Sequence, residues 1–188
     1  MDSFKGNKIE QKAEKIICFS SMEDAERGCT NLSFEIKKIL QSSSSEIIFL
    51  CIGSDRSTGD SFGPLVGTML IENHIPYPVF GTLSNPIHAL NLESVLKDIH
   101  KKYNNPLIIG IDACLGDYHQ IGSIYLNEGS FSPGNAVNNM LADLGDYHLA
   151  AVVNYLDVQF PSHSLNSTRL NTVITLAKIT AGVIIKAN

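Results

Sequence analysis

Paired cysteines and long apolar runs are absent from this sequence of 188 residues. Its four cysteines, Cys18, Cys29, Cys51 and Cys114, form neither a C-x-x-C pair nor a zinc-like spacing, which argues against a disulfide framework and a structural zinc site. No apolar run approaches the length that spans a bilayer, and residues 1–15 lack the apolar core of a secretory signal. We therefore expect a protein of the reducing cytoplasm.

Charge is also scarce. Charged residues make up 18% of the chain and the net charge is −5, which disfavours broad binding to nucleic acids or anionic membranes. Hydrophobic residues make up 44%, an ordinary composition for a globular protein, and the length favours one domain. We expect a single α/β domain over residues 46–188, with the tail and helix of residues 1–45 belonging to it or packed on it.

Apolar segments alternate in type along the chain. Helix-like spacing and short continuous apolar runs predict helices at 22–40, 62–72, 90–102, 135–144 and 166–186, strands at 46–53, 78–81, 106–112, 123–126 and 149–153, and a mobile or helical tail at 1–15. This alternation predicts a three-layer α/β/α sandwich around a mostly parallel sheet. Ligands of such sheets bind beyond the carboxyl ends of the strands, so the loops that leave the strands are the candidates for function.

The loop over 53–63 follows the first predicted central strand and enters a helix. Its glycines and short polar side chains could hold an anion at the helix N-terminus, but it lacks the Gly-Lys-Ser/Thr ending of a nucleotide-binding P-loop. Asp60 stands just before the helix. Position alone leaves two interpretations of Asp60 open, a helix N-cap and a functional carboxylate.

Other polar residues follow the remaining strands. Asp112 ends a predicted buried strand, where a charge needs a partner or a function, although a structural aspartate bonded to loop amides would also fit. His88 could titrate near neutral pH or could serve as a cap or packing residue. The turn at Pro133 and Gly134 enters a predicted helix, and the polar segment 154–166 could form a wall or lid.

Two aspartates at neighbouring strand ends have a mechanistic interpretation. If Asp60 and Asp112 lie close together, they cannot both ionise cheaply, so their proton affinities separate. One carboxylate could then deprotonate a water while the other protonates the substrate carbonyl, which is the chemistry of amide hydrolysis. The same oxygens could instead hold a metal ion, with His88 as a further ligand.

The sequence also resembles a known family, the YyaC family of sporulation proteins, often labelled spore proteases. The segments that carry the resemblance occur in the same order and are 51–67 (CIGSDRSTGDSFGPLVG), 81–83 (GTL), 86–92 (PIHALNL), 111–116 (IDACLG), 133–134 (PG) and 166–170 (NSTRL). More distantly, the chain is similar to the germination protease and to the hydrogenase maturation peptidases. These resemblances imply a phosphorylase/hydrolase-like fold.

The resemblance to the germination protease implies that Asp60 and Asp112 are a catalytic pair. We expect substrate contacts from Asp55, Arg56, His88, Asn91, Pro133 and Gly134, and we expect no bound metal or cofactor. Hydrogenase maturation peptidases carry a nickel-binding histidine in a loop that corresponds to residues 130–134, where this chain has none.

Two functions remain open at this stage. The first is a peptidase that uses the two aspartates during sporulation or germination, in the forespore or spore core, on protein or peptide substrates such as small spore proteins. It would act without nucleic acid or membrane, as a monomer or a homo-oligomer. The second is a catalytically inactive sporulation protein that keeps the peptidase scaffold to bind a peptide or partner.

Overall fold

The computed structural model describes residues 14–17, 22–129 and 145–188, and their side chains from residue 25 onward. Its strands are β1 (Glu14–Ile17), β2 (Ile47–Cys51), β3 (Val79–Phe80), β4 (Leu107–Gly116), β5 (Ser123–Glu128) and β6 (Tyr147–Tyr155). Its helices are α1 (Met22–Ser42), α2 (Phe62–Glu72), α3 (Leu92–Lys102), α4 (Pro161–Asn166) and α5 (Leu170–Ala187), with the short 3₁₀ helices η1 (Gly59–Ser61) and η2 (Tyr118–Gln120).

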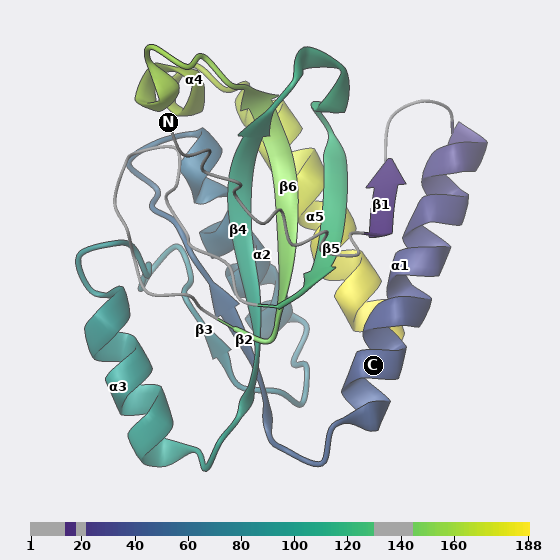
Figure 1. Ribbon diagram of the computed structural model, residues 1–188, viewed down its shortest axis with the longest axis vertical. Coiled ribbons are helices and arrows are strands. Elements are labelled where there is room, and N and C mark those ends of the chain that lie inside the picture. The colour runs from purple at the N-terminus through teal and green to yellow at the C-terminus, as the bar shows by residue number, and fades with distance from the viewer. Residues whose placement is uncertain (1–13, 18–21, 130–144) are drawn as a thin grey trace, which may run out of the picture.

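The described strands form one sheet in the order β1-β5-β6-β4-β2-β3 (Figure 1). Strands β3, β2, β4 and β6 are parallel to their neighbours, whereas β5 runs antiparallel to β6, and β1 runs antiparallel to β5. The central strands are continuous apolar runs because both of their faces are covered. The prediction of a mostly parallel sheet is confirmed.

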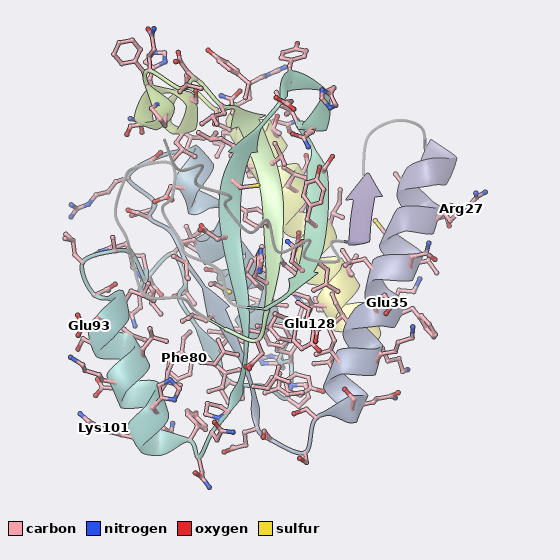
Figure 2. The ribbon with its side chains drawn as sticks, in the orientation of Figure 1. Arg27, Glu35, Phe80, Glu93, Lys101 and Glu128 are labelled. Carbon is pink, nitrogen blue, oxygen red and sulfur yellow. The ribbon has the colours of Figure 1, made fainter. Side chains whose placement is uncertain are left out.

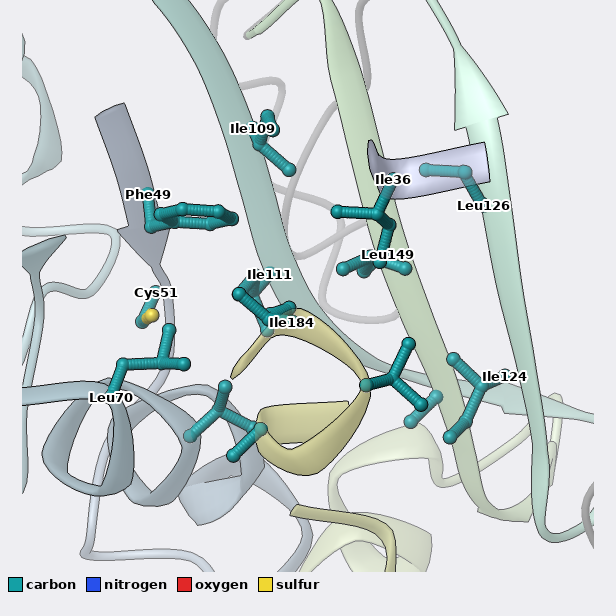
Figure 3. Close-up of a cluster of buried hydrophobic side chains, with 14 of the residues drawn as sticks. Ile36, Phe49, Cys51, Leu70, Ile109, Ile111, Ile124, Leu126, Leu149 and Ile184 are labelled. Atoms are coloured by element: carbon teal, nitrogen blue, oxygen red, sulfur yellow. The ribbon is translucent and has the colours of Figure 1, made fainter. Parts of the chain in front are cut away.

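Successive residues of β2 enter two separate cores. Phe49 and Cys51 pack with side chains of α1, α2 and α5, and Figure 3 shows this cluster with Ile36, Leu70 and Ile184 contributed by the three helices. Their neighbours Ile48 and Leu50 pack on the other face with side chains of α3. The sheet therefore lies between two helical layers, which confirms the α/β/α sandwich.

Charged side chains line the outer surfaces of the helical layers. Arg27 and Glu35 project from α1, and Glu93 and Lys101 project from α3, away from the sheet (Figure 2). Phe80 of β3 lies on the inner side of α3, where its ring meets Tyr103 edge-on. Charged outer faces and apolar inner faces are expected here, because apolar residues at helical spacing form one stripe that each helix buries against the sheet.

Three sequence predictions need correction. The mobile or helical tail predicted at 1–15 ends in a strand instead, because residues 14 and 15 belong to β1, which adds to the outer edge of β5. The closing helix predicted at 166–186 begins only at Leu170, because the chain turns over residues 167–169, where the Thr168 hydroxyl donates to the Ser164 carbonyl at 2.8 Å and Arg169 is extended; the separate helix α4 lies in the segment predicted as a polar wall or lid. The β4 strand continues past Asp112 to Gly116, because β6 pairs alongside it. The helix predicted at 135–144 lies outside the described residues.

Helix α5 also corrects the expectation about long apolar runs. By length and composition it could cross a membrane, which makes it the one such helix in the described part of the chain. In the structure, however, Val173, Leu176 and Ile184 of α5 are buried in the core shared with α1 and α2. A core helix of a soluble domain has the same length and composition.

Candidate functional site

The candidate site is built where β2 ends. The Ile52 amide donates to the Ile111 carbonyl of β4 at 2.8 Å, and Ile52 also forms a parallel bridge with Ile87. The next amide, that of Gly53, donates to the Ile87 carbonyl at 2.7 Å. The loops after β2 and β3 therefore leave the sheet side by side, next to the segment of β4 that contains Asp112.

Gly53 allows the loop to turn back on itself. Its φ is +140°, and a Cβ atom built on it would lie 2.0 Å from the backbone carbonyl oxygen of Asp60. The following amide, that of Ser54, donates to that same carbonyl oxygen at 3.1 Å. Only glycine fits this position, because it tolerates the φ and leaves room for the Asp60 backbone. The turn thus holds Asp60 over the end of β2.

Asp60 does not act as the side-chain cap of helix α2. It lies inside η1, while Ser61 occupies the N-cap position of α2 and makes no side-chain cap hydrogen bond. Of the two interpretations that the sequence left open, helix capping is not the one observed. The half-buried carboxyl of Asp60 remains available at the edge of the sheet.

Asp112 lies within β4, paired with Ala150 of β6, rather than at the strand end that the sequence indicated. Because side chains alternate along a strand, Asp112 lies on the α3 face of the sheet, opposite to its neighbour Ile111, which enters the core shared by α1, α2 and α5. Its Oδ1 accepts a hydrogen bond from the Ala113 amide at 2.8 Å. This bond uses only Oδ1, so the second carboxyl oxygen, Oδ2, is free of it and can contact a substrate.

The two carboxyls affect each other electrostatically. Burial raises the pKa of Asp112 to about 8, and the negative charge of Asp60 adds to this shift. Burial also raises the pKa of Asp60, but the Ser54 amide and His88 act in the opposite direction. A pKa of about 8 keeps Asp112 protonated at neutral pH, whereas the Ser54 amide and His88 favour the charged form of Asp60.

His88 is positioned by its own loop. The Asn91 side chain accepts from the His88 amide at 2.8 Å and donates to the Pro86 carbonyl at 3.0 Å. The Leu90 amide donates to His88 Nδ1 at 3.3 Å, which assigns the proton of a neutral ring to Nε2. The Asn91 side chain thus bonds the backbone of the loop that carries His88, and the substrate contact predicted for Asn91 stays a prediction.

The other predicted site residues are more scattered. Asp55 and Arg56 are exposed on the loop between Gly53 and Asp60. Pro133 and Gly134 lie outside the described residues. In the described part of the chain, His, Cys, Asp and Glu side chains form no group of three or more that could hold a metal ion.

Cys114 is a neighbour of Asp112 on β4 that was not among the predicted site residues. Both lie on the same face of β4, two residues apart. Burial, together with the charge of Asp112, raises the pKa of the Cys114 thiol to about 12. The thiol therefore stays protonated and is a poor nucleophile. Cys114 lies two residues beyond the strand predicted at 106–112, so the alternation of side chains could have located it only in a longer strand.

The segment after β6 forms a wall beside Asp60, as the sequence suggested. A Cβ atom on Gly59 would lie 2.9 Å from the Leu165 carbonyl and 3.0 Å from the Thr168 hydroxyl. The Leu156 amide ties the start of this segment to the Gly116 carbonyl at 2.8 Å. The wall thus contacts both the turn that carries Asp60 and the end of the strand that carries Asp112.

One solved structure has a similar fold. The [NiFe] hydrogenase maturation protease HycI from Thermococcus kodakarensis KOD1 matches with a TM-score of 0.50 over 80% of this chain and 98% of its own, at 19% sequence identity. Likeness at this level of identity concerns the fold alone. It confirms the predicted similarity to the hydrogenase maturation peptidases at the level of architecture.

Sequence comparison identifies the family. The chain is 36% identical over 173 residues to the uncharacterized protein YyaC of Bacillus subtilis (strain 168), which covers 92% of this chain and 82% of that protein. Residues 19–183 match the family described as protein of unknown function (DUF1256). The chain therefore belongs to the DUF1256 family, together with its relative YyaC.

Proposed function

We propose that this protein is a peptidase in which Asp60 and Asp112 hydrolyse a peptide bond during sporulation or germination. The observation that carries the proposal is the asymmetry of the two carboxyls, which interact electrostatically at the carboxyl edge of a parallel sheet. A pKa of about 8 keeps Asp112 protonated at neutral pH, and the Ser54 amide and His88 favour the charged form of Asp60. An acid and a base are thereby present together, as general acid–base catalysis requires.

In the proposed reaction, Asp60 takes a proton from a water molecule as the water oxygen attacks the substrate carbonyl carbon. Asp112 gives its proton to the carbonyl oxygen, which forms a neutral tetrahedral intermediate. The carbon–nitrogen bond then breaks while the proton held by Asp60 passes to the leaving nitrogen, and a hydroxyl proton of the intermediate returns to Asp112. The products are a carboxylic acid and an amine, and the pair regains its starting protonation.

His88 has a supporting part in this proposal. It interacts electrostatically with Asp60 and lowers the pKa of that carboxyl. The effect favours the charged form of the base, while the Asn91 amide fixes the loop that presents the ring. His88 is thus a positioning and electrostatic residue rather than the acid or the base.

The biological setting of the proposal rests on family resemblance. The YyaC family is associated with sporulation, which favours the forespore or spore core as the location and small spore proteins as substrates. The fold shared with the maturation protease HycI supports a peptidase-like scaffold. Neither observation names the substrate, so the test uses a mixture of spore proteins.

The test compares the wild-type protein with Asp60→Asn and Asp112→Asn on a spore protein extract, with new N-termini counted by mass spectrometry. We expect each variant to produce new N-termini at least about 100-fold more slowly, because each loses one half of the acid–base pair. Asp98→Asn is the matched control, since Asp98 is an exposed carboxylate on α3 that pairs only with Lys101. It should behave as wild type.

Two further arms make the result decisive. Circular dichroism shows that the variants are folded, because asparagine nearly matches aspartate in size and can still accept the bond from the Ala113 amide. A chelator arm separates the proposal from a metal-dependent hydrolase, which would lose activity on treatment. Equal cleavage by the wild type and both variants, or no cleavage by any of them, would overturn the peptidase and favour a binding scaffold.

A further inference from the structure

Exposed large apolar side chains gather at the edge of the sheet where the carboxyl pair lies. We name five of them the apolar rim: Tyr118, Tyr155, Leu156, Val158 and Phe160. Tyr118 lies in η2 beyond the end of β4, Tyr155 is the last residue of β6, and the other three lie in the segment that leads to α4. Figure 1 shows α4 and this segment beyond the ends of those strands. Val158 is 83% exposed and Phe160 is 64% exposed.

The rim is held open by hydrogen bonds of its own segment. The Asp157 carboxylate accepts from the amides of Gln159 and Phe160 at 2.9 and 3.1 Å. The Ser164 hydroxyl accepts from the Asp157 amide at 3.3 Å, and the Asn154 side chain donates to the Ser164 carbonyl at 2.8 Å. These bonds fix the backbone so that Val158 and Phe160 face solvent. Clustered exposed apolar groups of this kind mark interaction surfaces.

The rim is continuous with the proposed catalytic site on two sides. Tyr118 follows β4 directly, six residues beyond Asp112 in sequence, and Leu156 is bonded to Gly116 at the end of that strand. After Phe160, α4 runs to Leu165, whose carbonyl lies against Gly59 beside Asp60. A polypeptide held on the rim would therefore extend over the edge that carries both carboxyls.

Charge indicates what kind of partner fits. The segments 117–122 and 154–168 contain no lysine or arginine, and the whole chain carries a net charge of −5. Anionic membrane surfaces attract clusters of basic residues, which are missing here. The Asp157 carboxylate of the segment is already occupied by two amides. The rim thus suits an uncharged apolar partner.

We propose that the apolar rim is the substrate-recognition surface of this protein and that it takes an extended polypeptide segment rich in large apolar side chains. This inference rests on the proposed peptidase function and specifies its substrate class. Val158 and Phe160 are the specificity-determining residues, since they are the most exposed members of the bonded segment and need no rearrangement to accept a partner.

The experiment uses the full-length Asp60→Asn variant, which binds without cleaving. It is applied to an array of 15-residue peptides in two matched sets, one with three large apolar residues per peptide and one with serine or asparagine in their place. We expect selective binding to the apolar set. The added double change Val158→Ser, Phe160→Ser should weaken that binding by about tenfold or more, because each side chain loses its apolar contact with the peptide.

Phe34→Ser is the matched control. Phe34 is an exposed aromatic on α1, 58% exposed, and it lies on the helical layer rather than at the carboxyl edge. This change should leave peptide binding as it was. Equal binding of the two peptide sets, or the same loss for Phe34→Ser as for the rim variant, would overturn the inference.

Other occupants of the rim are separate outcomes of the test. Sedimentation velocity that shows a dimer dissociated by Phe160→Ser would assign the rim to a second copy of the chain and overturn the proposal. Binding to phosphatidylglycerol vesicles that is lost in the rim variant would also overturn the proposal, because it would assign the rim to a membrane surface. Failure of the proposed peptidase function would give a different result. The protein would still bind the apolar peptides selectively, but wild type and Asp60→Asn would cleave the spore extract equally.

Discussion

Asp112 lies in the middle of a strand, where burial makes a charged carboxylate costly. The raised pKa of Asp112, about 8, avoids this cost because the group stays protonated at neutral pH. A protonated carboxyl can donate to a substrate oxygen, which an ordinary aspartate cannot do at neutral pH. Burial is therefore a cost to stability that also supplies the acid of the proposed reaction.

Replacing Asp112 should change how stability depends on pH. The folded pKa of about 8 lies well above the ordinary value of about 4, so between these two pH values the folded state holds a proton that the unfolded chain has lost. The free energy of unfolding of the wild type therefore falls as pH rises through this window. Asp112→Asn removes that fall and should be more stable than wild type by about 5 kcal/mol at pH 9, since each unit of the pKa difference corresponds to about 1.4 kcal/mol.

Urea denaturation at pH 4 and at pH 9 measures this difference. At pH 4 the two proteins should differ by less than about 0.5 kcal/mol, because Asp112 is protonated in the folded state and only about half ionised in the unfolded chain. Asp98→Asn, which alters an exposed carboxylate, should show no comparable dependence on pH. A stability difference between wild type and Asp112→Asn that is the same at both pH values would contradict the assigned protonation.

At the scale of elements, the turn between β2 and α2 determines where Asp60 stands. The strand ends against β4, Gly53 reverses the chain, and Gly63 in the first turn of α2 packs on Ile52, where a Cβ atom would lie 2.1 Å from the Ile52 carbonyl. Helix and strand approach so closely only because neither glycine has a side chain. The glycines of this segment thus have a steric role rather than a phosphate-binding one.

Gly53→Ala should therefore be severely destabilising, by about 3 kcal/mol or more, because its Cβ would collide with the Asp60 backbone at a φ that alanine rarely adopts. Gly182→Ala is the matched control. Gly182 is exposed within α5 and a Cβ there meets no atom within 4 Å, so alanine should stabilise the helix by about 0.5 to 1 kcal/mol. Thermal and urea denaturation would measure both effects, and equal stabilities of the two variants would refute the steric argument.

For the whole molecule, α5 ties the helical layer together. It contacts α1 on one side and α2 on the other, and Leu176 is fully buried among them. The same helix has the length and composition of a membrane span. Its role as a core helix or a membrane helix is therefore decided by packing, since composition alone fits both.

Truncation of the buried face of α5 tests that role. Leu176→Ala should lower the free energy of unfolding by about 2 to 5 kcal/mol, because it leaves a cavity in the core. Leu170→Ala, at the exposed start of the same helix, should change it by less than about 0.5 kcal/mol. Urea denaturation of the protein in plain buffer supplies the measurement. Equal effects of the two changes would mean that α5 is not packed as the structure shows.

Local patterns in the sequence were sufficient for much of the architecture. The bounds of α2, Phe62–Glu72, agree with the prediction, and the buried strands β2 and β4 were recognised from their continuous apolar runs. Hydrophobic period and chain-breaking residues act over a few neighbours, so they can be read from one segment at a time. The candidate aspartates followed from the strand-end rule and from the family resemblance.

Tertiary structure decided the features that depend on residues far apart in the chain. Strand β1 exists as a strand because β5 offers an unpaired edge, and β4 runs beyond Asp112 because β6 pairs with it. The pKa of Asp112 depends on burial by other segments and on Asp60, which is distant in sequence. The apolar rim arises because a segment that looked polar in the sequence turns Val158 and Phe160 outward. Burial, exposure and electrostatic effects depend on which residues are close in space. Residues distant in sequence become neighbours only when the chain folds, so local sequence patterns cannot predict these properties.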